Sequence, residues 1–274
     1  MAKPKKKRKH KLTRKTADKY DLYQKAVQEP EFEVEFFDKQ FKKRFGRRPL
    51  LLREDFCGTA QVCAEWVKSK ADRRAVGVDL DPEPLHWYRE RIEPTLKPEQ
   101  ADRVTLLEAD VRTLADEGAD VLAAQNFSFF LFKSRDALRD YFQFDLDNLA
   151  PEGIMVLDMM GGSEVMLEDH EDETKKKGFT YIWEQKRFDP TTHDAKFAIH
   201  FKFKDGSKWK NAFEYDWRLW TIPEVRELLL EAGFSKVDVL WEGTDEDGEG
   251  DSDFKIRKHV PADPAWIAYI IAEK

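Results

Sequence analysis

Short apolar runs alternate with amphipathic stretches along the first part of the chain. Two helices are predicted over residues 20–28 and 31–45, where apolar residues recur at helical spacing. Five strand-like runs follow, with the sequences PLLLRE, AVGVDLD, VTLLEADV, ADVLAAQN and GIMVLDMM. Between these runs, helices are predicted over residues 60–68, 83–91 and 135–149. This alternation of strands and helices favours a mostly parallel sheet with helices on both faces.

The pattern changes after the fifth run. Three stretches, FTYIWEQKRF, AKFAIHFKFK and KWKNAFEYDWRLW, alternate apolar and polar residues, and Asp205-Gly206 is a hairpin signal between the last two. We therefore predict a small three-stranded antiparallel sheet, inserted after strand five over residues 163–221. A helix over Ile222–Ala232 is expected to end at Gly233. The last two runs, KVDVLWEG and AWIAYIIAE, have no helix between them and must pair as a hairpin, which makes the last strand antiparallel.

Charge is distributed unevenly along the chain. The 274 residues carry a net charge of −7, yet residues 1–19 hold ten Lys or Arg and one Asp, so the remainder is strongly acidic. We expect a disordered basic tail over residues 1–19 and one domain over residues 20–274. The tail is either simply solvated or contacts RNA or an anionic surface, and its PKKKRK stretch resembles a nuclear localisation signal. The acidic body disfavours nucleic acid as a substrate.

Hydropathy and cysteine content indicate the cellular compartment. No apolar run approaches the roughly 20 residues that cross a bilayer, so no membrane partner is expected. The two cysteines, Cys57 and Cys63, lie so close in sequence that a disulfide between them would stabilise the fold little, and no metal-ligand pattern surrounds them. We expect a cytoplasmic protein without a metal, with nuclear location as an alternative for a eukaryotic source. The oligomeric state is left open.

Acidic residues end three of the predicted strands. Ligands of open α/β sheets bind beyond the carboxyl ends of the strands, so Glu54, Asp79 and Asp110 are candidates for one site. Asp79 follows Gly58 at the usual spacing of an acid that accepts hydrogen bonds from ribose hydroxyls. Asp110 can receive an adenine amino group, and Glu54 can face an ammonium group or a water. Each acid alone also fits the N-cap of a helix.

The turn after the first strand, EDFCGTA, contains one glycine, Gly58. A dinucleotide loop keeps three glycines so that bare backbone amides can approach the pyrophosphate. Phe56 and Ala60 stand in place of the other two, which argues against NAD and an oxidoreductase. A cofactor without phosphate, carrying a sulfonium and an amino acid tail, needs a single close backbone contact. S-adenosylmethionine fits that description.

The stretches EDFCGTA, GVDLD, EADV, AAQNFSFF and GIMVLDMMGG resemble the successive motifs of class I S-adenosylmethionine-dependent methyltransferases. The resemblance covers roughly residues 20–274. It implies an enzyme with a Rossmann-like, seven-stranded sheet whose last strand is antiparallel, with S-adenosyl-L-methionine as cofactor. The cofactor-binding residues that it implies are Tyr23, Arg53, Glu54, Cys57, Gly58, Thr59, Asp79, Leu80, Asp110, Val111, Asn126 and Phe127.

The inserted sheet, with WRLWTIPEVRELLLEAGF after it, is similar to that of methyltransferases acting on small amines and related metabolites. The YDLYQ segment resembles the lid of such enzymes, which would place Tyr20 or Tyr23 near the methionine end; packing on the sheet edge is the alternative. Catalytic candidates are Tyr20, Tyr23 and His200, although a lone strand histidine is more often structural. Eight aromatic residues of the insert either line a site for a cationic substrate or form its core: Trp183, Phe197, Phe201, Trp209, Phe213, Tyr215, Trp217 and Trp220.

These observations predict methyl transfer by in-line displacement to a small-molecule acceptor, at nitrogen in first place and oxygen in second. Strand four lacks the proline-containing stretch with which enzymes that methylate nucleic acid bases clamp a flipped base. Two alternatives stay open. One is a methyltransferase that the basic tail delivers to RNA or a basic protein. The other is a non-catalytic binding module that retains the fold.

Overall fold

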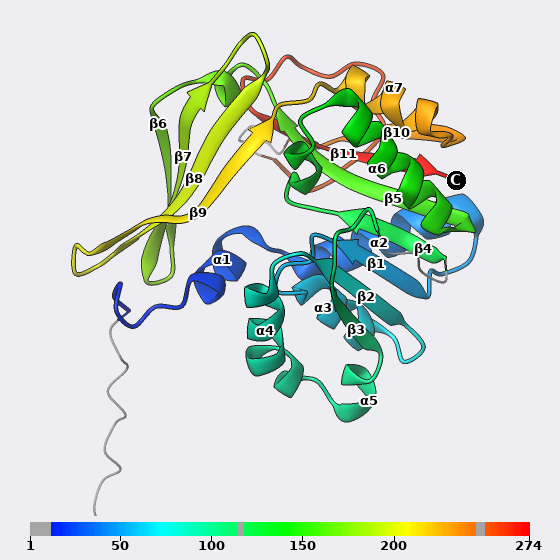
Figure 1. The fold of residues 1–274 in the computed structure, drawn as a ribbon, viewed down its shortest axis with the longest axis horizontal. Coiled ribbons are helices and arrows are strands. Elements are labelled where there is room, and N and C mark those ends of the chain that lie inside the picture. Colours follow the sequence, from blue (N-terminus) through cyan, green and yellow to red (C-terminus); the bar gives the residue numbers. More distant parts are fainter. Residues whose placement is uncertain (1–11, 114–117, 245–249) are drawn as a thin grey trace, which may run out of the picture.

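The computed structural model of the protein describes residues 12–113, 118–244 and 250–274. Within them, a seven-stranded sheet forms the centre of the molecule, in the order β10-β11-β5-β4-β1-β2-β3 (Figure 1). All of its strands are parallel except β11, which runs antiparallel to both of its neighbours. This arrangement confirms the predicted sheet with an antiparallel last strand. The strands are β1 Leu51–Asp55, β2 Arg74–Asp79, β3 Val104–Glu108, β4 Ala119–Ala124, β5 Leu149–Gly161, β10 Lys236–Trp241 and β11 Trp266–Glu273.

Helices cover both faces of this sheet, as predicted. Buried side chains of α6 and α7 pack on one face, and those of α2, α3 and α4 pack on the other. The helices are α1 Lys19–Val27, α2 Pro30–Phe45, α3 Gln61–Ser69, α4 Pro82–Arg91, α5 Pro98–Ala101, α6 Arg135–Asn148 and α7 Ile222–Ala232, with 3-10 turns η1 Glu93–Thr95, η2 Ser128–Leu131 and η3 Glu164–Met166. None of the described helices is long and apolar enough to cross a membrane.

A second, antiparallel sheet stands beside the first, in the order β6-β7-β8-β9 (Figure 1). Its strands are β6 His170–Lys176, β7 Phe179–Phe188, β8 Asp194–Phe203 and β9 Lys208–Arg218. The prediction of three strands was wrong by one, because β6 has the sequence HEDETKK and offers no apolar alternation. Charged side chains suit an edge strand, since they discourage pairing with other chains.

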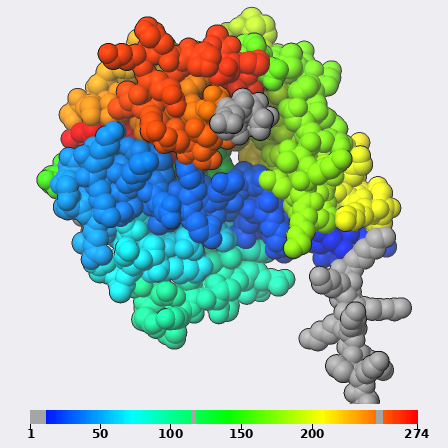
Figure 2. Space-filling view, turned by 180° about the vertical axis from the view of Figure 1, so that it is seen from behind, coloured from blue at the N-terminus to red at the C-terminus, as the bar shows by residue number. Residues whose placement is uncertain are grey.

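The predicted tail boundary at residue 19 also needs correction, because part of the tail is packed. Leu12 packs against the apolar face of the second sheet, and the Arg14 guanidinium lies 3.5 Å from the centre of the Trp209 ring. Asp18 caps the first turn of α1 by accepting hydrogen bonds from two backbone N–H groups. Residues 1–11, with the PKKKRK stretch, lie outside the described residues. Figure 2 shows the N-terminal helices (blue) crossing one side of the molecule between the C-terminal residues (orange and red) and the first βα units (cyan).

Candidate functional site

Three neighbouring cavities lie along the carboxyl ends of the parallel strands. We call them the edge cavity, about 410 Å³, the loop cavity, about 270 Å³, and the aromatic cavity, about 420 Å³. The edge and loop cavities share the lining residues Phe56, Asp79 and Asp81. The loop and aromatic cavities share Tyr23, Asn126 and Tyr215. The three cavities therefore form a row in which the loop cavity is the middle member.

The loop between β1 and α3 forms one wall of the loop cavity. Its backbone is left-handed at Phe56, Gly58 and Ala60, with φ of 56°, 53° and 46°. For the two residues with a side chain, this conformation costs roughly 1 kcal/mol each. The Phe56 ring lies 6.0 Å from the Phe132 ring and 5.8 Å from the Tyr141 ring, and this packing holds the strained backbone. The loop thus keeps the backbone form of a glycine-rich turn with one glycine.

Gly58 faces open space inside the loop cavity. A Cβ added there would meet no heavy atom within 4 Å, so a side chain would extend into the cavity rather than clash with the protein. The cavity is therefore shaped for a group that approaches the bare backbone at this position.

Asp79, at the end of β2, joins the loop and edge cavities. One carboxylate oxygen accepts a hydrogen bond from the Gly58 N–H at 2.7 Å, and the other accepts one from the Asp81 N–H at 2.9 Å. Burial raises the pKa of Asp79 even though these N–H groups favour its charged form. Each oxygen keeps further lone pairs, so Asp79 can still accept hydrogen bonds from a ligand that spans both cavities.

Three residues with hydrogen-bond acceptors, Glu54, Gln125 and Gln28, line the loop cavity. Burial raises the pKa of Glu54 to about 7, against hydrogen bonds from the Cys63 backbone N–H at 3.2 Å and its thiol at 3.0 Å. Gln125 and Gln28 also line this cavity, and their side-chain oxygens are buried without a hydrogen-bond partner. Because buried polar atoms are almost always paired, these acceptors fit a ligand with several donors, such as an ammonium group.

The edge cavity combines apolar flanks with three carboxylates, Asp79, Asp81 and Asp110. Leu80 and Leu131 are 68% and 48% exposed and leave an apolar surface on which a flat ring can rest. Arg112 holds Asp110 with two side-chain hydrogen bonds of 3.0 and 2.7 Å, and this contact lowers the pKa of Asp110. Val111 completes the wall.

Asp158 on β5 shapes the junction between the loop and aromatic cavities. Its carboxylate accepts hydrogen bonds from the backbone N–H groups of Asn126 and Phe127, both at 3.0 Å. These two residues are left-handed, with φ of 58° and 59°. Burial raises the pKa of Asp158 to about 7 against the two hydrogen bonds. Asp158 thus fixes the turn that places Asn126 at the junction.

The aromatic cavity lies between the two sheets, and Tyr23 separates it from the loop cavity by lining both. Its described wall contains three carboxylates, Glu164, Asp172 and Glu242, and no Lys, Arg or His. The Tyr23 and Tyr215 hydroxyls interact at the junction, and burial raises the pKa of both, so both stay neutral. The aromatic members of the wall are Tyr23, Phe127, Tyr181, Trp183, Tyr215, Trp217 and Trp266.

Helix α1 covers the loop cavity, so the two predicted tyrosines lie at the site. Tyr20 and Tyr23 both line the cavity, and their rings also lie 5.9 and 4.9 Å from Phe213 of the second sheet. The Gln24 side-chain amide donates to the Thr59 hydroxyl at 2.8 Å, which fastens α1 to the loop after β1. Both tyrosines therefore line the cavity and pack against the second sheet.

Every predicted cofactor residue except Arg53 lines one of the three cavities. Arg53 is fully buried, forms an ion pair with Asp55 at 2.7 Å, and donates to the Val111 carbonyl at 2.9 Å. The prediction failed because β1 is buried on both faces, so its sequence does not show which side chains point toward the site. Phe127 does line a cavity, but this is the aromatic cavity rather than the loop cavity.

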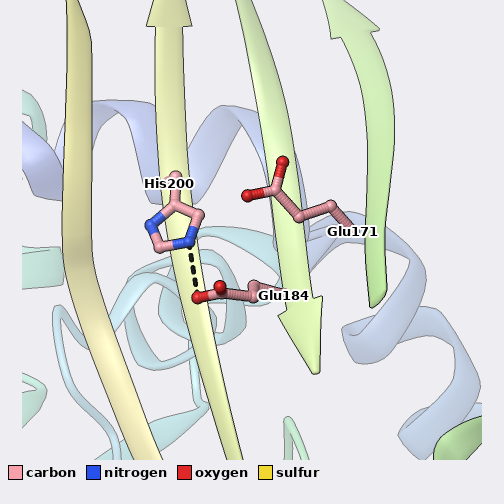
Figure 3. Close-up of side chains that lie close together, drawn as sticks. All are labelled: Glu171, Glu184 and His200. Atoms are coloured by element: carbon pink, nitrogen blue, oxygen red, sulfur yellow. Dashed lines mark hydrogen bonds and ion pairs between the residues drawn. The ribbon is translucent and has the colours of Figure 1, made fainter. Parts of the chain in front are cut away.

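His200 points away from the cavities, so its placement as a catalytic candidate was wrong. Its Nδ1 accepts a hydrogen bond from the Asn211 N–H at 2.8 Å, and its Nε2 lies 2.9 Å from Glu184 (Figure 3). Nδ1 is therefore an acceptor and Nε2 donates a hydrogen bond to Glu184, which leaves neither nitrogen free as a base or metal ligand, although Glu171 lies nearby. Asn211 is left-handed, with φ of 50°, and His200 holds this irregular point of β9.

The aromatic residues of the insert divide between site and core. Trp183, Tyr215 and Trp217 line the aromatic cavity, and Phe213 lines the loop cavity. Phe197, Phe201 and Trp220 are buried in the core. Sequence reasoning missed Gln125, Asp158 and Gln185 as site residues. Asp158 ends the apolar part of GIMVLDMM, and that position was a signal of the kind that identified Asp79.

Comparison with known proteins was made on sequence and on structure. No protein-family model matches the sequence, and no curated protein matches it. A S-adenosylmethionine-dependent methyltransferase from Clostridium acetobutylicum superimposes with a TM-score of 0.67 at 16% identity, over 93% of this chain and 96% of that chain. CalS10, an amino pentose methyltransferase from Micromonospora echinaspora, gives 0.65 at 14% identity, over 94% and 97%. The sugar N-methyltransferase KedS8 from Streptoalloteichus gives 0.62 at 16% identity, over 100% and 98%.

These similarities extend over nearly the full length of each chain, including the second sheet that roofs the site. At this level of identity they establish architecture. The chain has the fold of class I S-adenosylmethionine-dependent methyltransferases.

Proposed function

We propose that the protein is a methyltransferase that uses S-adenosylmethionine to methylate the nitrogen of a small amine. The observation that carries this proposal is the junction of the loop and aromatic cavities at Tyr23, Asn126 and Tyr215. A group transferred from a ligand in one cavity to a ligand in the other has to pass this point.

The residues around the loop and edge cavities fit the cofactor. Glu54 and the unpaired oxygens of Gln125 and Gln28 would hold the amino group, and Gly58 would allow close approach of the backbone. Asp79, which lines both cavities, would accept hydrogen bonds from ribose hydroxyls. Asp110, Val111 and the exposed leucines would hold adenine in the edge cavity.

When bound, S-adenosylmethionine supplies a methyl carbon that its sulfonium charge has already activated. The protein then has to align an acceptor lone pair and exclude water. Helix α1 covers the site, fastened by the hydrogen bond between Gln24 and Thr59. Tyr23 and Tyr215, both neutral, can orient the acceptor by hydrogen bonds at the junction.

An amine is favoured over other acceptors by the chemistry of the aromatic cavity. Aromatic faces attract cations, and the three carboxylates of the described wall add negative charge without a competing cation. An amine has to lose its proton before attack, and a neutral tyrosine cannot take that proton as a base. We therefore infer that the proton of the amine leaves toward the carboxylates of the aromatic cavity wall and from there to solvent. CalS10 and KedS8 act on an amino pentose and on a sugar nitrogen, which supports this choice.

The test is a transfer assay with purified protein, S-adenosylmethionine carrying a labelled methyl group, and parallel pools of small amines and small alcohols. We expect labelled methylamine products together with S-adenosylhomocysteine. Label in the alcohol pool alone would show that the acceptor atom is oxygen rather than nitrogen. A protein that binds the cofactor and yet labels neither pool would contradict the proposal.

A further inference from the structure

Gln185 is a buried amide without a partner in the aromatic cavity. The residue is 5% exposed and lines the cavity, and its side-chain oxygen has no hydrogen-bond partner. No hydrogen bond joins its amide nitrogen to any other residue in the described part of the chain. A buried polar group is costly when it stays unpaired, and native proteins leave few of them. An unpaired amide on a buried residue that lines a cavity therefore indicates a ligand group that pairs with it.

The position of Gln185 on β7 explains how the amide reaches the cavity. Tyr181, Trp183 and Gln185 alternate along the strand and point to the same side, and all three line the cavity. The pairing between β7 and β8 shifts register directly after Gln185, between Gln185 and Arg187. Such irregularities occur often beside functional sites, where they redirect a side chain.

The surroundings of Gln185 are aromatic rather than polar. Its partner across the ladder with β8 is Phe197, whose ring stacks on Trp183 with centres 5.0 Å apart. In the proposed function the carboxylates of the cavity wall attract the cationic group of the acceptor. The amide of Gln185 would therefore recognise a different group of the same ligand. An amide both donates and accepts, and a hydroxyl is the small group that can satisfy both functions at once.

We propose that Gln185 is a specificity residue that hydrogen-bonds a hydroxyl group of the acceptor, so that the acceptor is a hydroxylated amine. This inference rests on the proposed function and adds a second recognition point to it. A site built around a hydroxyl rejects the analogue without it, because the amide would then stay buried and unpaired.

The test compares two ligands that differ by one hydroxyl, trans-4-aminocyclohexanol and cyclohexylamine. Both are titrated calorimetrically into the complex of the protein with S-adenosylhomocysteine. We expect the aminocyclohexanol to bind at least about tenfold more tightly, the effect of one buried hydrogen bond. Gln185→Met keeps the length of the side chain and removes the amide, so the ratio should fall to about one. Gln143→Met, exposed on α6, is the matched control and should keep the wild-type ratio.

Each outcome decides the matter. Equal affinities in the wild type, or an unchanged ratio in Gln185→Met, would overturn the role of Gln185. Failure of both amines to bind, in a protein that binds S-adenosylhomocysteine, would overturn the hydroxylated-amine class and leave the cofactor site intact. Failure to bind S-adenosylhomocysteine would overturn the proposed function itself. Binding of S-adenosylhomocysteine by Gln185→Met shows that the variant is folded.

Discussion

The carboxylate of Asp79 accepts a hydrogen bond from the backbone N–H of Gly58 at 2.7 Å, so the loops that follow β1 and β2 are held together. The same carboxylate lines both the loop cavity and the edge cavity. It is therefore both a fixed part of the protein and a candidate acceptor for a ligand that spans the two cavities.

Asp79→Asn should weaken cofactor binding. The amide keeps the size of the carboxylate but loses its charge and half of its acceptors, and a hydrogen bond to a charged group contributes about 1.5–3 kcal/mol. We expect the Kd for S-adenosylhomocysteine to rise about 10- to 100-fold in calorimetric titration. Asp72→Asn, which changes an exposed residue paired with Arg48, is the control and should bind as the wild type does. Unchanged affinity in a folded Asp79→Asn would remove Asp79 from the site.

Cofactor binding should release a proton near pH 6. Burial raises the pKa of Glu54 to about 7, so the carboxyl is mainly protonated below that pH in the free protein. A ligand ammonium beside it favours the charged form and lowers the pKa again. The affinity for S-adenosylhomocysteine should then rise as the pH increases toward 7 and level off above it.

The measurement is the binding heat near pH 6 in two buffers with different ionisation enthalpies. A released proton makes the two heats differ, and Glu54→Gln should reduce that difference. Equal heats in the wild type would show that Glu54 does not lie beside the bound ammonium.

Gln24→Leu should loosen the lid. The change removes the hydrogen bond from α1 to Thr59, a contact of about 0.5–1.5 kcal/mol. We expect S-adenosylhomocysteine to dissociate about two- to tenfold faster, and the amide hydrogens of α1 to exchange faster with solvent. Lys25→Gln alters only the local ion pair with Asp21 and should change neither rate. If Gln24→Leu releases ligand at the wild-type rate, α1 does not hold the site closed.

Arg53→Met should destabilise the fold. Removal of the guanidinium leaves the buried Asp55 without its ion pair, which typically costs about 3–5 kcal/mol. The free energy of unfolding, measured with urea, should fall by that amount. The double variant Arg53→Met, Asp55→Leu should recover part of the loss, because it removes the stranded charge. A single variant as stable as the wild type would contradict the structural role assigned to Arg53.

The sequence predicted the fold well where its pattern reflects burial. Alternating apolar runs and helices identified the parallel sheet, and acids such as Asp79 and Asp110, at or just after strand ends, indicated the edge of the sheet along which the cavities lie. β6 could not be predicted, since an exposed edge strand buries no face and its charges carry no period. Arg53 and His200 were misassigned for a related reason: the direction of a strand side chain changes with every residue. Gln185 was not identified because an unpaired amide is a property of the folded cavity, which no local pattern shows.

The central claim is that the row of cavities binds S-adenosylmethionine, and one measurement tests it most directly. Purified protein is titrated calorimetrically with S-adenosylmethionine and S-adenosylhomocysteine, with NAD as the control ligand. The account predicts that the first two bind with a Kd on the order of micromolar and that NAD does not bind. A folded protein that binds neither of the first two would contradict the account.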